Sequence, residues 1–278
     1  MIRTPAVAGM FYEARPRELR ASVENLITRQ HAPKPAFGAI VPHAGYVYSG
    51  RVAGEVFARL AIPSAVVIVS PNHTGRGAPA ALDPSEAWRT PLGDVVVDAR
   101  LSRRMVELAP SLQPDRTAHA REHSLEVELP FLQVLRPDVA IVPICLGAHD
   151  LDLCREVGEA FSRLRAEERE DPPLLLASSD MNHYESRAIG ARKDGRALER
   201  IESLDPEGLF AAVISESISM CGVLPATALL FAARAAGAGP ARVVARADSG
   251  DETGDVSSVV GYAGVVVDPE KSPARPGA

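Results

Sequence analysis

The sequence has few cysteines and lacks any long apolar run. Its three cysteines, Cys145, Cys154 and Cys221, are too few and too scattered for a disulfide framework, which favours a reducing compartment. No apolar run approaches the roughly 20 residues that a membrane-spanning helix needs. Residues 1–10 also lack the apolar core of a signal peptide. We therefore expect a cytoplasmic protein without a membrane anchor.

Positive charge is also scarce. The chain of 278 residues has 30 Lys and Arg against 36 Asp and Glu, so its formal net charge is −6, which argues against a nucleic-acid binder. Hydrophobic residues make up 46% and charged residues 24%, a composition that excludes wholesale disorder. The length suits one large α/β domain. We expect a single domain over residues 1–267 and a flexible, proline-rich tail over residues 268–278.

Short apolar runs alternate with amphipathic stretches along the chain. The apolar runs predict strands at residues 37–41, 65–70, 94–98, 139–144, 174–178, 242–247 and 259–267. The amphipathic stretches predict helices that begin at an N-cap Ser49 and at residues 100–108, 122–135, 151–165, 187–202, 206–215 and 225–236, with Pro130 a kink or early stop. Several strands are apolar on both faces, so we expect an α/β fold with a mostly parallel central sheet flanked by helices on both faces.

Polar side chains follow three of the predicted strands. His43 follows the first strand, His73 the second, and Asp180 and His183 the strand at 174–178. In open α/β sheets, ligands bind outside the carboxyl ends of the strands, so these groups meet if the strands are neighbours. Imidazole is a common metal ligand and proton carrier, and two histidines with a carboxylate or thiolate can hold non-haem iron. A lone loop histidine is more often a surface residue, so the pattern leaves a shared site and separate surface positions both open.

Cys221 has two interpretations. It precedes the predicted helix at 225–236, and a helix N-terminus lowers the pKa of a thiol and favours the thiolate. The competing interpretation is a small buried apolar residue, the common fate of a free cysteine. Cys145 lies inside an apolar strand and Cys154 inside a helix, so we assign both to packing.

The charged segment around residue 123 is also ambiguous. His123 and Glu126 lie three residues apart, on one face of the predicted helix at 122–135. They are either a solvated first turn whose glutamates suit the helix dipole or supporting residues that orient a ligand or substrate. The other histidines, His31, His119 and His149, are expected at the surface.

The remaining motifs are weak. The acidic segment at 248–255 lacks the full spacing of a calcium-binding EF-hand loop, and a turn between two strands explains it better. The sequence contains no Walker loop, no dinucleotide-binding G-x-G-x-x-G and no G-x-S-x-G elbow.

Seven segments, in one order, resemble the MEMO family, also called AmmeMemoRadiSam system protein B. They span residues 3 to 267 approximately, and several in one order are more specific than any single motif. They are R-T-P-A-V-A-G-M-F-Y at 3–12, P-H-A-G-Y at 42–46, S-P-N-H-T at 70–74, R-T-P-L-G at 89–93, E-H-S-L-E at 122–126, S-S-D-M-N-H at 178–183 and M-C-G at 220–222.

The resemblance implies a relative of the class III extradiol dioxygenases, which are non-haem Fe(II) enzymes with an α/β fold. It implies that His43 and His73 are metal ligands and that Cys221 stands where those enzymes have a carboxylate ligand. Asp180 and His183 then line the same pocket. A thiolate ligand admits copper or zinc beside Fe(II).

The chain departs from the family at positions 223 and 224, where Val and Leu replace the Arg and His of some members. This departure removes positive charge from the pocket entrance and argues against an anionic substrate.

Two functions fit these residues and the resemblance. The first is a dioxygenase-type oxidoreductase with Fe(II) held by His43, His73 and Cys221, in which His183 moves a proton and Asp180 orients His183 or a metal-bound water. The second is a non-catalytic mediator that binds a metal, a small molecule or a peptide in the same pocket. The resemblance also implies AMMECR1-like and radical SAM proteins as partners.

Overall fold

The computed structural model describes residues 1–28 and 32–270. His31 and residues 271–278 of the tail expected at 268–278 lie outside these residues. The first residues of that tail are described, and Asp268 and Glu270 form ion pairs with Arg242 and Arg165. The strands form one mixed sheet. They are β1 (Ile2–Arg3), β2 (Gly38–Val41), β3 (Ala65–Pro71), β4 (Ala80–Leu82), β5 (Ala87–Thr90), β6 (Gly93–Val97), β7 (Gln113–Pro114), β8 (Ala140–Leu146), β9 (Leu174–Ser178), β10 (His183–Glu185), β11 (Ala241–Asp248) and β12 (Val259–Val267).

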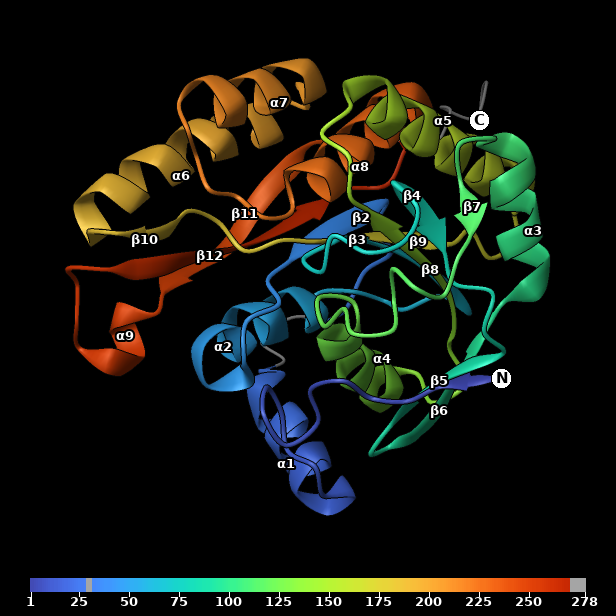
Figure 1. The fold of residues 1–278 in the computed structure, drawn as a ribbon, viewed down its shortest axis with the longest axis horizontal. Helices are drawn as coiled ribbons and strands as arrows, with labels where there is room; N and C mark the ends of the chain where they lie inside the picture. The colour runs from blue at the N-terminus through green and yellow to red at the C-terminus, as the bar shows by residue number, and fades with distance from the viewer. Residues whose placement is uncertain (29–31, 271–278) are drawn as a thin grey trace, which may run out of the picture.

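The helices cover both faces of this sheet (Figure 1). They are α1 (Pro16–Leu26), α2 (Tyr46–Phe57), α3 (Ala99–Leu108), the 3-10 helix η1 (Glu126–Glu128), α4 (Leu129–Leu135), α5 (Leu151–Glu167), α6 (Arg187–Glu202), α7 (Pro206–Ser215), α8 (Val223–Ala236) and α9 (Gly250–Thr253).

The centre of the sheet is parallel. Its strand order is β1-β5-β6-β8-β3-β9-β2-β12-β10, and β6, β8, β3, β9 and β2 run parallel to one another. Strand β12 pairs antiparallel with β2, and β11 and β10 pair antiparallel with β12. The predicted α/β architecture with a mostly parallel sheet is confirmed.

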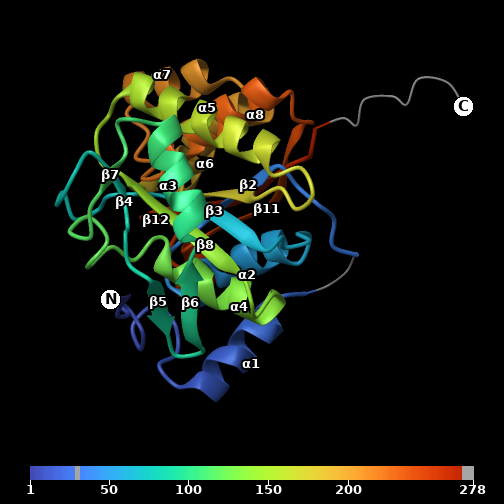
Figure 2. The same ribbon diagram turned by 90° about the vertical axis from the view of Figure 1, so that its right-hand side faces the viewer.

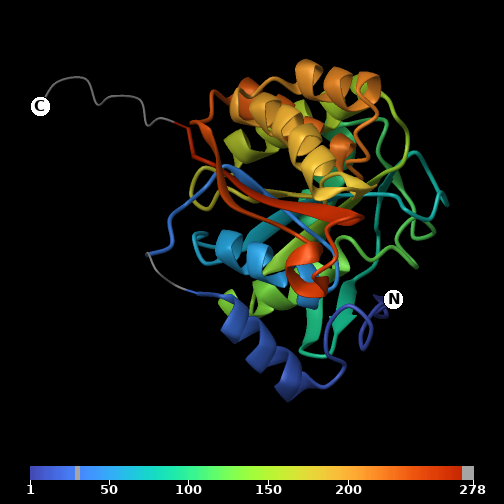
Figure 3. The same ribbon diagram turned by 90° about the vertical axis from the view of Figure 1, so that its left-hand side faces the viewer.

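Two apolar cores lie on the two faces of the sheet. One core contains side chains of α3, α5, α6, α7 and α8, and the other contains side chains of α1, α2 and α4. Figures 2 and 3 show the same two helical layers from the two sides. Strands β3 and β9 are buried along their whole length, which is the property that their apolar runs predicted.

Several local predictions differ from the structure. Helix α2 begins at Tyr46 rather than after Ser49, because the extended Gly45 caps it. No helix spans 122–135. Helix α4 begins at Leu129, and Pro130 lies in its first turn, where the missing N–H costs nothing. The sequence patterns also missed α1, with only two buried residues, and the short strands β1, β4, β5, β7 and β10.

The structure also shows where the remaining histidines, the other two cysteines and the acidic segment lie. His149 is exposed as expected. The expectation that His119 lies at the surface is wrong: the residue is buried, with its ring against Trp88 and its Nε2 within hydrogen-bond distance of the Ala81 carbonyl. Cys154 is buried in the core beside α5, and Cys145 is buried in a small separate cluster with Ala81 and Ala118. In the acidic segment, Asp248 and Asp251 both pair with Arg187, so the guanidinium group balances their charge and the segment needs no calcium ion to explain it. No helix among the described residues is long and apolar enough to cross a membrane.

Candidate functional site

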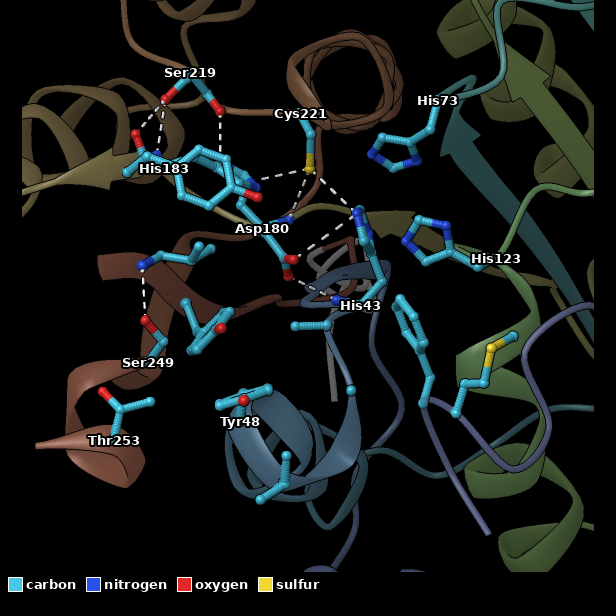
Figure 4. Close-up of a pocket in the computed structure, with 18 residues that line it drawn as sticks. His43, Tyr48, His73, His123, Asp180, His183, Ser219, Cys221, Ser249 and Thr253 are labelled. Atoms are coloured by element: carbon cyan, nitrogen blue, oxygen red, sulfur yellow. Dashed lines mark hydrogen bonds and ion pairs between the residues drawn. The ribbon is translucent and has the colours of Figure 1, made fainter. Parts of the chain in front are cut away.

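The carboxyl ends of three adjacent parallel strands bring the predicted side chains together. Strands β3, β9 and β2 are neighbours in the sheet, and His73, Asp180 and His43 follow their last residues. Cys221 lies on none of these strand ends but on the segment just before α8. Figure 4 shows His43, His73 and Cys221 directed at one point. The convergence that the strand pattern predicted is therefore present.

His43 is buried and held at both ends. Its backbone N–H donates to Asp180 Oδ1 at 2.8 Å, and its ring Nδ1 lies 2.8 Å from Ser178 Oγ. The Ser178 hydroxyl donates to the Ser124 carbonyl at 2.7 Å, so it accepts from Nδ1–H of His43. Burial, with the neighbouring histidines, holds the pKa of His43 well below its usual range. The ring is therefore neutral, and its Nε2 lone pair faces Cys221.

His73 is partly exposed, and a buried carboxylate fixes its ring. Glu122 Oε1 accepts from His73 Nδ1 at 2.9 Å, and Oε2 accepts from the His73 backbone at 2.6 Å. The same carboxylate accepts from the His123 and Ser124 amides and from the Ser124 hydroxyl. Burial alone raises the pKa of Glu122, but the hydrogen bonds from His73 and Ser124 outweigh it and lower the pKa. The second nitrogen of His73 is thus free to bind a ligand.

Cys221 completes the cluster at the start of α8. Its Sγ lies 3.2 Å from His43 Nε2 and accepts from the Asp180 backbone N–H at 3.3 Å. Burial raises the pKa of this thiol well above its ordinary value, and the Asp180 carboxyl adds to that effect. A helix N-terminus alone therefore does not make Cys221 a thiolate. A bound cation can, because metal binding competes with the proton.

The donor atoms fit a transition-metal ion. Atoms of His43, His73 and Cys221 all lie within 4.8 Å of one another. A tetrahedral ion about 2.1 Å from nitrogen and about 2.3 Å from sulfur keeps such atoms roughly 3.5 Å apart. The cluster therefore needs small side-chain shifts to hold an ion. Two imidazoles and one sulfur are a donor set that suits iron, copper or zinc.

Asp180 and His183 line the same cavity but do different things. The Asp180 carboxyl accepts from the His43 and Ala44 amides, and burial raises its pKa to about 7. The His183 ring is oriented by Ser219 instead, because its Nδ1 lies 2.8 Å from the Ser219 carbonyl. Nε2 of His183 therefore carries the lone pair, and burial lowers the pKa of the ring. Ser219, rather than the expected Asp180, therefore orients the His183 ring.

The two residues predicted to share a helical face, His123 and Glu126, are separated by the fold. The His123 ring lies 4.7 Å from that of His73 and 5.5 Å from that of His43, measured between centroids. The Glu126 carboxylate faces the other way and binds Arg3, the Ala6 and Val7 amides and the Tyr12 hydroxyl. His123 thus belongs to the site. Glu126 instead anchors the N-terminal segment whose Met10 and Phe11 line the cavity.

Three supporting residues were not predicted from the sequence. They are Glu122, Ser178 and Ser219, which hold His73, His43 and His183 respectively. Glu122 is adjacent to His123 in the E-H-S-L-E segment, and Ser178 is the last residue of a predicted strand. These sequence positions could have indicated that Glu122 and Ser178 support the site, but only the folded chain shows which histidine each residue contacts.

The cluster opens into a cavity of about 800 Å³. Ligand sites commonly have volumes of this order, with apolar walls and a few convergent polar groups. The cavity walls come from α2, α9 and β12 and from the loops that carry the cluster. A bound ion would be accessible from this cavity.

Comparison with known proteins identifies the family. The sequence profile described as Memo-like protein matches residues 3–266. The chain belongs to the Memo-like family. A MEMO1 family protein of Methanopyrus kandleri is 43% identical over 280 residues, which cover 96% of this chain and 99% of the relative. A MEMO1 family protein of Aeropyrum pernix is 43% identical over 281 residues, with the same coverage of 96% and 99%.

A solved structure supports the fold of this Memo-like protein. The crystal structure of an uncharacterized protein from Escherichia coli K12 superposes with a TM-score of 0.56 at 17% identity, and the match covers 84% of this chain and 99% of that chain. At this identity the likeness concerns the fold alone. A function is therefore inferred from the family membership and from the candidate metal-binding cluster.

Proposed function

We propose that this Memo-like protein binds one transition-metal ion through His43, His73 and Cys221, and that the site serves a dioxygenase-type oxidoreductase. Iron(II) is the first choice, with copper or zinc as alternatives. The observation that carries the proposal is the approach of the three donor atoms to within 4.8 Å from three separate segments of the chain. Each imidazole in this cluster also has a fixed partner on its other nitrogen.

The roles of the ligands follow from their surroundings. Ser178 and Glu122 accept from the Nδ1 atoms of His43 and His73, which leaves the Nε2 atom of each ring as the one that would bind an ion. Cys221 gives up its proton when a cation binds. The bound ion supplies Lewis acidity and an open coordination face for an oxygen-dependent reaction.

His183 is the proton carrier in this proposal. Its Nδ1 is held by the Ser219 carbonyl, so its Nε2 takes or returns a proton inside the cavity. The lowered pKa of the ring keeps it neutral before it acts, which suits a base. Asp180 accepts from the His43 backbone N–H and so holds that residue in place. We also propose that Asp180 orients a metal-bound water.

Anaerobic purification followed by metal analysis tests the site. We expect about one iron, copper or zinc per chain in the wild type, and little or none in His43→Ala or Cys221→Ala. His149→Ala is a matched control, because His149 is an exposed histidine that does not line the cavity. A wild-type protein that holds no metal after anaerobic reconstitution would contradict the proposal.

The sulfur ligand favours a second function. Thiolate is a soft ligand that suits copper and zinc as well as iron, so the same cluster could hold an ion without turnover. The protein would then act as a metal- or peptide-binding mediator, and AMMECR1-like and radical SAM proteins would be its partners. Oxygen consumption by the iron-loaded protein, measured with a panel of catechols, separates the two functions. Metal that stays bound while no oxygen is consumed favours the mediator.

A further inference from the structure

Away from the metal cluster the walls of the cavity are mostly apolar and aromatic, with hydroxyl groups from Ser249 and Thr253 among them (Figure 4). Phe11 stands beside His123, with 4.8 Å between ring centroids, and Tyr48 and Tyr262 also line the cavity. Figure 4 shows Tyr48 on α2, across the cavity from Cys221. A volume of about 800 Å³ exceeds what one small aromatic ring occupies, so the cavity has room for a longer body.

Three of the side chains that line this cavity are large, exposed and mainly apolar, and we call them its rim. Met10 is 73% exposed, Val47 is 64% exposed and Tyr184 is 77% exposed, and they come from three separate segments. Tyr184 has a φ of +60°, a conformation that is unusual for a bulky residue. Single exposed apolar residues need no explanation, but several around one cavity mark a surface that contacts something apolar.

Positive charge is missing from the same walls. Among the described residues that line the cavity, none is Lys or Arg, and Asp180 is the one carboxyl group. Proteins bind carboxylates and phosphates with Arg, Lys or free amides at helix N-termini. Arg187, whose partners Asp248 and Asp251 are close in sequence to the lining residues Ser249 and Thr253, is itself not among the lining residues.

Several of the amides just before and at the start of α2 are already used within the protein. Asp180 accepts from the amides of His43 and Ala44, and the Tyr46 amide donates to the Phe11 carbonyl. At the start of α8, the Gly222 amide faces the Cys221 sulfur. These particular amides are therefore used within the protein, and the described residues of the cavity walls supply no Lys or Arg for an anionic group on a ligand.

We infer that the cavity takes an uncharged, largely apolar organic molecule with one chelating polar end, and that it selects against ligands whose body carries a carboxylate or phosphate. The chelating end faces the cluster of His43, His73 and Cys221, and the apolar body contacts Phe11, Tyr48 and the rim. This inference rests on the proposed function, because the metal ion is what holds the chelating end.

The test compares two ligands with the same chelating head. Protein loaded with Zn(II), which is redox-inactive, is titrated by calorimetry with 4-methylcatechol and with 3,4-dihydroxybenzoate at pH 7. We expect 4-methylcatechol to bind at least about tenfold more tightly, a difference of about 1.4 kcal/mol. Equal or tighter binding of the benzoate would overturn the inference.

A charge placed on the rim gives the complementary test. Val47→Arg adds a cation at an exposed position in the first turn of α2 and should reduce the preference to less than about threefold. Ile214→Arg is the control, since Ile214 is 52% exposed on α7 and does not line the cavity. An unchanged preference in Val47→Arg, or an equal change in Ile214→Arg, would also overturn the inference.

Zinc content is measured before each titration, so the two proposals fail differently. A wild-type chain that binds no zinc contradicts the proposed metal site. A chain that binds zinc but neither catechol leaves the metal site standing and overturns the inference about the ligand.

Discussion

Two buried glutamates four residues apart allow a sharp test of the metal site. Glu122 supports His73, whereas Glu126 supports the N-terminal segment, and both are fully buried. Glu122→Gln keeps the shape of the side chain but removes its charge and replaces one acceptor oxygen with an amino group. That group must face either the His73 backbone N–H or the donors gathered at Oε1. At least one hydrogen bond is therefore lost.

The size of the effect follows from these contacts. Losing the carboxylate partner of a metal-binding imidazole typically lowers metal affinity by about 10–100-fold. That range corresponds to about 1.4–2.7 kcal/mol, consistent with about 1.5–3 kcal/mol for one hydrogen bond to a charged group. We therefore expect the zinc dissociation constant of Glu122→Gln to rise about 10–100-fold, although His43, His73 and Cys221 are unchanged.

Glu126→Gln is the matched control. It breaks a buried ion pair with Arg3, which typically costs about 3–5 kcal/mol of folding free energy, but it touches no member of the metal cluster. If this variant folds poorly, Tyr12→Phe removes one hydrogen bond to the same carboxylate at a cost of about 1 kcal/mol. Both controls should keep wild-type zinc affinity in the folded state.

Chelator competition measures zinc affinity, and urea unfolding in the presence of EDTA measures the stability of the same variants. Zinc binding by Glu122→Gln within about threefold of the wild type would contradict the role assigned to Glu122. An equal loss of zinc affinity in a folded Glu126→Gln or Tyr12→Phe would contradict it as well. Either result would mean that the Glu122 hydrogen bonds do not set the ligand geometry of His73.

Three further predictions follow from other contacts of the site and the fold. Ser178→Ala removes the acceptor of His43 Nδ1 and should weaken zinc binding about tenfold in the same chelator assay. Because burial raises the pKa of Cys221, zinc binding should release a proton and tighten as pH rises, as calorimetry in buffers of different ionisation enthalpy can show, and Cys221→Ala should lose both the binding and this dependence. Burial raises the pKa of Asp194 from 3.8 to about 6. Folding therefore favours its protonated form, so this group adds stability as pH falls from above 6 to below 4, by about 3 kcal/mol. Asp194→Asn should remove that gain in urea unfolding between pH 8 and pH 4.

The central sheet was predictable because its signal is local. The runs that became β2, β3 and β9 are apolar on both faces, and this pattern alone indicates buried parallel strands. Their carboxyl ends then place His43 and His73 at one edge of the sheet. The short strands of two to four residues and the charged helix α1 carry too few buried side chains to leave such a pattern.

Cys221 shows where the local signal ends. Before α8 its sequence surroundings were equally consistent with a packing residue, and the resemblance to the family supplied the metal role. In the structure its sulfur lies 3.2 Å from a histidine that is 178 residues away along the chain. A contact of this sequence separation depends on how strands and helices pack together, and periodicity does not encode it.

The segment from Glu122 to Glu126 shows why helical spacing selected the wrong carboxylate. His123 and Glu126 share a face only if the segment is helical, yet the 3-10 helix begins at Glu126 and the preceding residues form turns. The turn directs Glu122 inward beneath His73, while the start of the 3-10 helix directs Glu126 toward Arg3. Both glutamates are buried, so burial does not distinguish them. The difference lies in which distant backbone each one meets, and for Glu122 that is the loop after β3, which carries a ligand of the proposed metal site.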